Sequence, residues 1–458
     1  MQHLTLVEYG KVAALYKDKG EKPVEKEGGV VIDKNDYDAL DEMLRTADKR
    51  DDDLGKLMNP CMWRLKEGRR KAIQMRNYAG VIMLPSGLCL EILPKIHLEK
   101  VENSRERTLE ILLKMLRAWP DSPFQTFKRA TLESLKEPLL ESFITCFLDD
   151  VAALIRRGLC SDYVAVEDNQ IFLRGKLKLH EHIRHNAARQ ERFYVSYDDF
   201  LPDRPENRLV KNALLQVARW SGSCENQRRC KIYGLAFADV PPSKDFAADF
   251  AACRPDRNLQ HYEAALSWCR LILYGQSPIP QAGSHSCLSL LFPMEKLFEY
   301  YVAKNLRSQL AKEWQVTEQA SQRYLVESYK GKTFYRLKPD LLFINKNNSA
   351  LCVIADTKWK LLKSDKDLKE PGDLYQIFAY AEKYLATRSF LIYPKTESSQ
   401  QPFEPFWFRK PRTDDSEKSS ILYALLYDLE TDDCLGMDES LGTDQYPISR
   451  LMKKQNNP

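Results

Sequence analysis

The chain has 458 residues, enough for about three domains of roughly 150 residues each, so a peptide-sized binding module is excluded. Hydrophobic residues make up 43% and charged residues 29%, as in ordinary globular proteins and unlike disordered or fibrous chains. The 69 Lys and Arg against 65 Asp and Glu give a net charge of only +4, so any DNA-binding surface must be local.

The start of the chain and its cysteines indicate a cytoplasmic protein. The first eight residues lack the basic and apolar segments of a secretory signal, and no apolar run approaches the roughly 18 residues of a membrane span. The 11 cysteines contain no Cys-x-x-Cys pair, which favours reduced thiols over a disulfide framework or a zinc ribbon. We therefore expect no contact with a membrane.

The first 160 residues are predicted to form a β-rich and helical N-terminal module. Apolar stretches and turn residues predict strands at 4–7 and 30–32, a helix at 36–47, and a hairpin with strands at 81–84 and 88–93. Leu and Phe at helical spacing predict further helices between residues 106 and 157, ending at Gly158.

Residues 161–287 are predicted to link this module to a C-terminal domain. A hairpin is expected over 163–173, turning at Asp168-Asn169, and a helix over 206–220. Between them, residues 174–192 carry six Lys or Arg against two Glu. A solvated face and a nucleic-acid contact explain this basic window equally well, and the candidate DNA-binding residues are Arg174, Lys176, Lys178 and Arg184.

Three histidines in the same window raise the question of a metal site. They are His180, His182 and His185, and they lie among the cations named above. Metal sites usually collect anionic or thiolate ligands, and this neighbourhood offers the opposite charge. The sequence therefore disfavours a metal at these histidines.

Residues 288–458 are predicted to fold as an αβββαβ core, which makes the whole chain an α+β or α/β protein. Helical spacing begins after Pro293, and a second helix is expected over 373–384. The predicted strands, by apolar content, cover 324–326, 335–344, 350–355 and 389–393.

Acidic and basic side chains are expected to meet at one end of this predicted sheet. Asp340 lies on the strand over 335–344, and Asp356 and Lys358 end the strand that follows. A turn near Asn347 or Asn348 would put Asp340 opposite Asp356 or next to that position, where facing Cβ atoms are about 5 Å apart. Two carboxylates this close favour a bound Mg²⁺, and a lysine beside them suits phosphodiester hydrolysis.

Three further residues belong to this candidate site. Gln376 and Tyr380 are four residues apart on one helix face, and Glu299 is the candidate third carboxylate for the metal, with Asp340 and Asp356. A structural ion pair at a strand end, with a buried Tyr and a solvated Gln, remains the alternative interpretation.

These motifs resemble a known superfamily and, within it, a family. Pro339-Asp340, Asp356-x-Lys358 and Gln376-x-x-x-Tyr380 resemble the PD-(D/E)xK nucleases in the variant with a Gln-x-x-x-Tyr helix. The blocks that resemble the McrC family, the nuclease subunit of the McrBC modification-dependent restriction system, are Leu93-Pro94-Lys95, Arg174-Gly175-Lys176-Leu177, Glu206-Asn207-Arg208 and Met294-Glu295-Lys296-Leu297-Phe298-Glu299. Residues 36–53 and 224–269 match no part of the family pattern.

The resemblance implies a Mg²⁺-dependent endonuclease subunit that cuts double-stranded DNA carrying modified cytosine such as 5-methylcytosine. It also implies a separate McrB-like AAA+ GTPase that reads the modified base, docks the N-terminal part of this chain and is stimulated by it. This chain has no Gly-x-x-x-x-Gly-Lys-Ser/Thr loop, so GTP would be used by the partner.

Two alternatives stay open. One is a stand-alone nuclease of the RecB or Cas4 type, although Cys352 is the only cysteine between residues 288 and 433, which disfavours the iron–sulfur form. The other is a non-catalytic activator of a AAA+ ring. Such an activator has no chemical need for two clustered carboxylates and a lysine.

Overall fold

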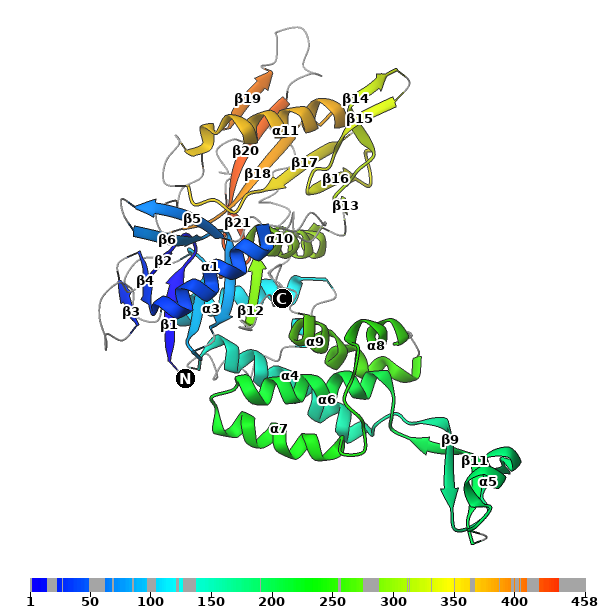
Figure 1. Ribbon diagram of the computed structural model, residues 1–458. Helices are drawn as coiled ribbons and strands as arrows, with labels where there is room; N and C mark the ends of the chain where they lie inside the picture. Colours follow the sequence, from blue (N-terminus) through cyan, green and yellow to red (C-terminus); the bar gives the residue numbers. More distant parts are fainter. Residues whose placement is uncertain are drawn as a thin grey trace, which may run out of the picture.

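The computed structural model shows a chain of several sheets joined by a helical region (Figure 1). The residues it describes are 2–14, 23–26, 28–48, 62–67, 70–84, 86–96, 104–120, 123–126, 137–189, 191–253, 257–274, 288–310, 312, 314–330, 332–349, 351–362, 367–386, 388–396, 399, 403, 405–409 and 420–435. Within these residues, no helix combines the length and the apolar character that a membrane crossing needs.

Two small sheets and one helix make up the N-terminal part. Its elements are β1 His3–Val7, β2 Lys11–Ala14, β3 Val24–Lys26, β4 Gly29–Ile32, α1 Lys34–Asp48, β5 Met62–Glu67, β6 Arg70–Met75, β7 Tyr78–Met83 and β8 Cys89–Leu93. One sheet has the order β3-β4-β2-β6-β5, and the other contains β1, β8 and β7. The sheets and α1 enclose a common core around Val12, Ile32, Leu40 and Ile92. The predicted helix over 36–47 and the hairpin over 81–93 are confirmed.

A strand from much later in the chain completes the second sheet. β12, Leu288–Pro293, pairs antiparallel with β7, so the order is β1-β8-β7-β12. Gly80 allows this pairing, because a Cβ there would lie 1.9 Å from the carbonyl oxygen of Leu290. Pro293 therefore ends a strand, and the helix expected there begins at Met294. The boundaries at 160 and 287 stay predictions, but β12 belongs to the N-terminal sheet.

A helical region forms the middle of the molecule. Its helices are α3 Ser104–Ala118, α4 Leu139–Arg157, α6 Pro205–Trp220, α7 Cys224–Ala236, α8 Phe246–Ala252 and α9 Glu263–Tyr274, with 3-10 turns η1 Pro123–Thr126 and η3 Arg257–Tyr262. Phe124 packs against Phe143, Trp268 and Phe292 at ring-centroid distances of 5.0 to 5.5 Å. The predicted helices between 106 and 157 and over 206–220 are confirmed.

A three-stranded sheet projects from this helical region (Figure 1). It contains β9 Asp162–Gln170, β10 Lys176–Leu177 and β11 Phe193–Leu201, with the helix α5 Leu179–Asn186. The hairpin predicted over 163–173 is wrong, because residues 162–170 form one continuous strand paired with β11. Asn169 does not turn the chain. Its side chain exchanges hydrogen bonds of 2.8 and 2.7 Å with the buried Asn186, which holds α5 on the sheet.

The C-terminal part is built on a seven-stranded sheet. Its main order is β13-β16-β17-β18-β20-β19, with β21 paired to β20. The elements are α10 Met294–Leu310, β13 Trp314–Glu318, β14 Arg323–Tyr329, β15 Lys332–Leu337, β16 Leu341–Asn345, β17 Cys352–Thr357, η4 Asp367–Lys369, α11 Pro371–Tyr384, β18 Arg388–Pro394, β19 Phe406–Arg409, β20 Ser420–Tyr427 and β21 Cys434–Leu435.

The strand predicted over 335–344 is wrong, because it is two strands. β15 pairs with β14 in a separate two-stranded hairpin, and β16 pairs with β13 and β17 in the main sheet. The break falls at residues 338–340, where Pro339 cannot donate to a strand ladder. The first strand of the main sheet is therefore β13 and not residues 324–326. α10, β13, β16, β17, α11 and β18 follow one another with this hairpin inserted.

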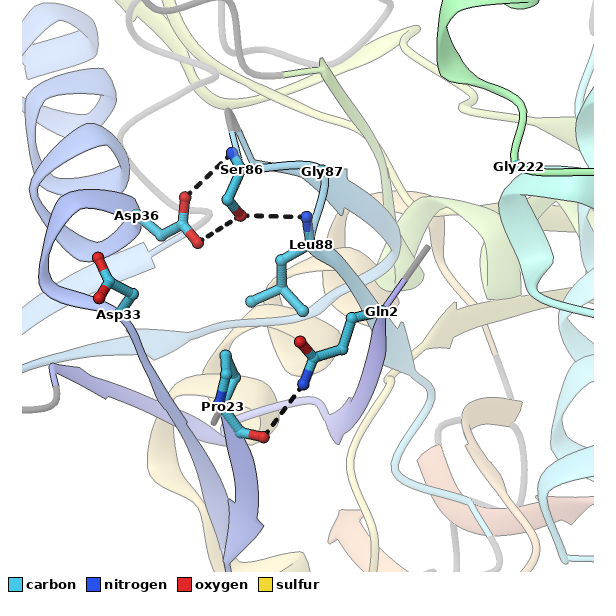
Figure 2. Close-up of a pocket in the computed structure, with 8 residues that line it drawn as sticks. All are labelled: Gln2, Pro23, Asp33, Asp36, Ser86, Gly87, Leu88 and Gly222. Atoms are coloured by element: carbon cyan, nitrogen blue, oxygen red, sulfur yellow. Dashed lines mark hydrogen bonds between the residues drawn. The ribbon is translucent and has the colours of Figure 1, made fainter. Parts of the chain in front are cut away.

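One pocket of about 530 Å³ lies beside α1 in the N-terminal part (Figure 2). Asp36 and Ser86 both line the pocket, and Asp36 accepts hydrogen bonds from the Ser86 backbone N–H and hydroxyl at 3.3 and 2.6 Å. The Ser86 hydroxyl in turn accepts from the Leu88 amide at 3.2 Å. These contacts explain Asp36 as a support for the turn between β7 and β8.

Candidate active site

The strand register brings the two predicted aspartates together. Leu341 faces Ala355 across the antiparallel pair of β16 and β17, so the next position outward sets Asp340 opposite Asp356. Side chains alternate between the faces of a strand. Leu342 and Ile354 contribute to the same core as Ile377 of α11, so both aspartates belong to the α11 face of the sheet.

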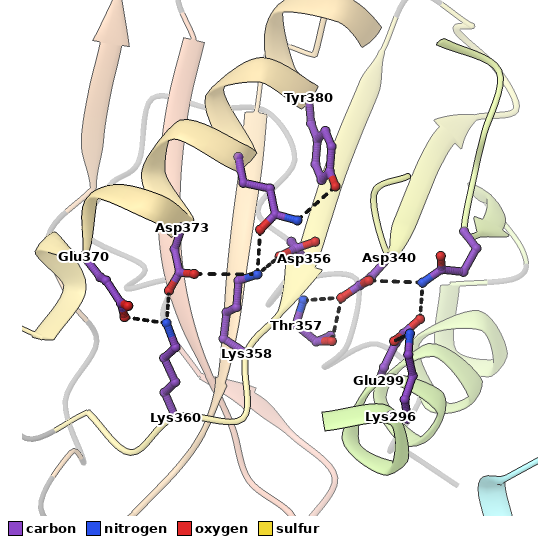
Figure 3. A network of polar contacts seen from close by, with 12 residues as sticks. Lys296, Glu299, Asp340, Asp356, Thr357, Lys358, Lys360, Glu370, Asp373 and Tyr380 are labelled. Atoms are coloured by element: carbon purple, nitrogen blue, oxygen red, sulfur yellow. Dashed lines mark hydrogen bonds and ion pairs between the residues drawn. The ribbon is translucent and has the colours of Figure 1, made fainter. Parts of the chain in front are cut away.

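Lys358 is the centre of the contacts on this face (Figure 3). Its Nζ lies 2.5 Å from Oδ2 of Asp356 and 3.7 Å from Oδ1 of Asp373, and it donates to Oε1 of Gln376 at 2.9 Å. The Gln376 amide donates to the Tyr380 hydroxyl at 2.9 Å. The structure thus brings together four of the predicted residues, Asp356, Lys358, Gln376 and Tyr380.

Asp340 is fixed by the end of β17 and by Gln319. Its Oδ2 accepts hydrogen bonds from the backbone N–H and the side-chain hydroxyl of Thr357 at 2.8 and 2.7 Å. Its Oδ1 accepts one from the side-chain amide of Gln319 at 3.2 Å. The same Gln319 amide donates to Glu299, whose other oxygen pairs with Lys296 at 2.7 Å. Glu299 comes from α10 and is joined to Asp340 through Gln319, so its role as a metal ligand stays a prediction.

Burial and repulsion between carboxylates dominate the electrostatics. The pKa of Asp340 is raised to about 7, first by burial and then by the charges of Asp356 and Glu299. Burial also raises the pKa of Asp356, although Lys358 opposes this. Burial lowers the pKa of Lys358, but Asp356 and Asp373 more than offset it, so the net shift is upward. Lys358 therefore carries a positive charge at neutral pH.

The carboxylate oxygens of Asp340 and Asp356 are of the kind that binds Mg²⁺. Mg²⁺ is usually held by one or two carboxylates and keeps several waters for substrate oxygens. Oδ2 of Asp356 is buried and accepts no hydrogen bond of good geometry from any described residue, although Lys358 lies beside it. Among the described residues no group of three or more His, Cys, Asp or Glu is arranged to hold a metal, so the fit rests on two aspartates.

The four predicted DNA-binding residues lie on the projecting sheet of β9 to β11 and α5, at the opposite end of the molecule from β16 and β17 (Figure 1). Arg174 pairs with Asp199 at 3.1 Å, and Lys178 pairs with Glu167 at 2.5 Å. His182 accepts a hydrogen bond from the Tyr194 amide at 3.3 Å. Part of the basic charge is therefore paired within this sheet, and its contact with DNA stays a prediction.

A second buried network joins the N-terminal part to the residue after Lys358. The indole of Trp359 donates to both oxygens of Glu8 at 3.1 and 3.0 Å, and Lys95 Nζ donates to the Trp359 carbonyl at 2.9 Å. The Lys95 amide donates to Glu8 at 3.0 Å. Glu8 and Lys95 thus hold Trp359 by its side chain and its backbone. No local pattern predicts a role for Glu8, because its partners are 87 and 351 residues away.

The chain matches the family model described as McrBC 5-methylcytosine restriction system component over residues 73–394. It belongs to the McrBC family. The McrC resemblance found in the sequence is confirmed. No curated protein matches this sequence.

Two solved structures are similar to this McrBC family member, and the first has the same fold. One is a refined half-complex from a tetradecameric assembly of Thermococcus gammatolerans McrB AAA+ hexamers with bound McrC. A chain in it has a TM-score of 0.67 and 19% identity, over 99% of both chains. A chain in the Thermococcus gammatolerans McrBC complex has a TM-score of 0.48 and 22% identity, over 71% of this chain and 90% of that one.

Sequence reasoning missed several residues at the site of this McrBC family member. Asp373 lies three residues before Gln376 on α11 and contacts both Lys358 and Lys360, so the helical spacing that pointed to Gln376 and Tyr380 also includes it. Thr357 and Gln319 carried no comparable signal. Their contacts with Asp340 depend on the strand register and on a left-handed turn at Gln319, whose φ is 49°.

Proposed function

We propose that this chain is the DNA-cleaving subunit of a McrBC-like restriction system that acts on DNA carrying modified cytosine. The observation that supports it is the placement of Asp340 opposite Asp356 with Lys358 Nζ 2.5 Å from Asp356, on the α11 face of one sheet. This arrangement supports a PD-(D/E)xK nuclease site in the αβββαβ core expected from the sequence.

Asp340 and Asp356 would hold a Mg²⁺ ion, which supplies an activated water and stabilises charge on the scissile phosphate. Lys358 would orient or deprotonate the attacking water, or stabilise negative charge that develops on the phosphate. Gln376 and Asp373 keep its ammonium at the end of β17. Thr357 orients Asp340 through two hydrogen bonds.

The partner in this proposal is a McrB-like AAA+ GTPase, which would consume GTP and select the modified DNA. The related fold is found in an assembly of McrB AAA+ hexamers with bound McrC, which favours a AAA+ ring here as well. Stimulation of the partner's GTPase by residues 1–160 belongs to the same proposal.

The experiment is cleavage of a plasmid containing 5-methylcytosine by the full chain with its AAA+ partner, GTP and Mg²⁺. We expect Asp356→Asn and Lys358→Ala each to slow cleavage at least about 100-fold, because losing a metal ligand or the ammonium removes several kcal/mol of transition-state stabilisation. Stimulation of GTP hydrolysis should persist in both variants.

Asp239→Asn, at an exposed site outside the sheets, is the matched control and should cut at the wild-type rate. Mg²⁺ should also raise the melting temperature of the wild-type chain more than that of Asp356→Asn. Wild-type cleavage by Asp356→Asn or Lys358→Ala would refute the assignment of the active site.

A further inference from the structure

The hairpin of β14 and β15 stands apart from the main sheet. It is a two-stranded antiparallel sheet inserted between β13 and β16, and it extends beyond the seven-stranded sheet (Figure 1). β14 and the residues before it are tied to the end of α11, where Lys383 pairs with Glu327 at 3.1 Å and the Tyr384 hydroxyl donates to the Ala320 carbonyl at 2.9 Å. β15 ends at Leu337, just before Asp340, so the hairpin leads directly into the candidate active site.

This hairpin buries little of its own surface. All residues of β15 except Leu337 are exposed, and β14 is exposed or half-buried along its length. It nevertheless displays aromatic side chains, with Tyr329 58%, Phe334 41% and Tyr335 75% exposed. An isolated two-stranded hairpin is marginally stable in water. Exposed aromatic rings on such an element indicate a surface that is covered by a partner.

The charge of the hairpin indicates a polyanion as that partner. Residues 321–339 contain five Lys or Arg and one Glu, and that Glu327 is already paired with Lys383. Two of the cations lie beside aromatic rings of the hairpin. The Arg336 guanidinium is 5.8 Å from the Tyr324 ring centroid, and the Lys330 ammonium is 5.5 Å from the Tyr329 ring centroid. The exposed cations are Arg323, Lys330, Lys332, Arg336 and Lys338.

The backbone at Tyr335 adds a separate observation. Its φ is 57°, in the left-handed region that aromatic residues rarely adopt, and its ring is the most exposed on the hairpin. Strained residues of this kind cluster at ligand-binding positions. Exposed Lys and Arg side chains bind a nucleic-acid backbone by neutralising its phosphates, whatever the base sequence.

We propose that the β14–β15 hairpin is the arm that holds the DNA backbone beside Asp340 and Asp356. The proposal rests on the proposed nuclease function and adds the surface that positions its substrate. Phosphate contacts carry no sequence information, so the arm binds modified and unmodified DNA alike. The basic window over 174–192 is less suited to hold DNA beside Asp340 and Asp356 of the same chain, because it lies at the opposite end of the molecule from β16 and β17 (Figure 1).

The experiment compares DNA binding by the full-length wild type and the triple variant Lys330→Gln, Lys332→Gln, Lys338→Gln. The probe is a fluorescent 30-base-pair duplex of unmodified DNA, titrated in EDTA at several KCl concentrations so that binding is measured without cleavage. Each phosphate contact contributes about 0.9 to the slope of log affinity against log salt, so the triple variant should flatten the slope by about 2 to 3. The single variant Lys332→Gln should flatten it by about 0.9.

A matched triple variant controls for net charge. Arg219→Gln, Lys231→Gln and Lys244→Gln remove the same charge from exposed sites in the helical region and should leave the slope unchanged. Equal slopes for the hairpin variant and the wild type would overturn the proposal, and so would a wild-type chain that does not bind the duplex at 50 mM KCl.

Cleavage and GTPase assays on the same proteins separate this proposal from the nuclease assignment. A flattened slope in a chain that never cuts DNA would refute the nuclease and support the arm. An unchanged slope with normal cleavage would refute the arm alone. An unchanged slope with lost stimulation of the GTPase would mean that the hairpin docks on an acidic protein surface, which also overturns the DNA assignment.

Discussion

Glu8 is a buried carboxylate whose ionisation affects stability. Its pKa is raised to about 7, because burial outweighs Lys95 and the Trp359 indole, which lower it. As pH rises from about 4.5 to 7, the unfolded chain releases this proton before the folded chain does. The free energy of unfolding therefore falls over that window, by about 3 kcal/mol for a shift of this size.

We expect Glu8→Gln to remove this pH-dependent loss. Glutamine cannot ionise, so between pH 5 and pH 7.5 the free energy of unfolding should fall less in the variant than in the wild type. Urea unfolding at pH 5, 6, 7 and 8 measures the difference. Glu110→Gln, at an exposed site on α3, should follow the wild-type curve. Parallel curves for Glu8→Gln and the wild type would contradict the prediction.

The same contacts have a positional consequence for the site. Trp359 follows Lys358 directly and is held by Glu8 and Lys95 from the N-terminal part. The Phe298 ring of α10 packs on Trp359 at a centroid distance of 5.4 Å. The end of β17 is thus fixed by residues from three separate stretches of sequence, which would keep Lys358 in place for the role proposed above.

At the scale of elements, the pairing of β7 with β12 depends on Gly80. An alanine Cβ there would lie 1.9 Å from the Leu290 carbonyl oxygen, and φ is 141°. We expect Gly80→Ala to destabilise the protein by about 3 kcal/mol or more, since both the close contact and the backbone angle oppose it.

Gly87→Ala is the matched control for this prediction. Its φ is also positive, at 84°, but nothing lies within 4 Å of the added Cβ, so only about 1 to 2 kcal/mol of backbone strain is expected. Thermal unfolding of both variants gives the comparison. Equal losses of stability would show that the approach of β12 to β7 does not restrict position 80.

The sequence predicted the helices and strands that have one apolar face or are apolar throughout. It did not predict features that depend on contacts between residues far apart in the chain. β8 and β17 are apolar apart from Glu91, Asp356 and Thr357, which is typical of buried strands. In the β14–β15 hairpin only Leu337 is buried, so the sequence predicted part of each strand, at 324–326 and from 335 onward, but not that the two pair outside the main sheet. Asn169 has turn chemistry, but here its amide pairs with Asn186.

The residues of the candidate site also fall into those that local spacing predicts and those that depend on distant contacts. Local spacing was enough for Asp356, Lys358, Gln376 and Tyr380, because a strand and a helix each repeat regularly. Gln319 and Glu8 reach the site through contacts with residues 21 and 351 positions away, which no local pattern encodes. Glu299 was identified by its place on α10, but the contact with Gln319 was not.

At the scale of the whole molecule, one core crosses all three predicted domains. It includes Phe143 of α4, Trp268 of α9, and Phe292 and Phe298 from β12 and α10. A fragment of residues 1–160 would lack β12 and most of this packing. It is therefore a poor choice for testing whether the N-terminal part stimulates the GTPase.

We expect residues 1–293 to form a more stable fragment than residues 1–274. The longer fragment keeps β12 on the edge of β7, while the shorter one leaves that apolar edge unpaired. Thermal unfolding and size-exclusion chromatography of the two fragments measure the effect. A shorter fragment that is equally stable and monomeric would show that β12 is not needed to complete the sheet.

The β7–β12 pairing also sets a delay during synthesis on the ribosome. Met83 pairs with Leu288, 205 residues later in the chain. At about 5 to 20 residues per second, the partner strand emerges roughly 10 to 40 s after β7. Throughout that interval the β7 edge can pair with another nascent chain. The soluble yield of this protein therefore depends on whether β12 is synthesised before the β7 edge associates with another chain. At low expression, nascent chains meet less often, which favours the native sheet.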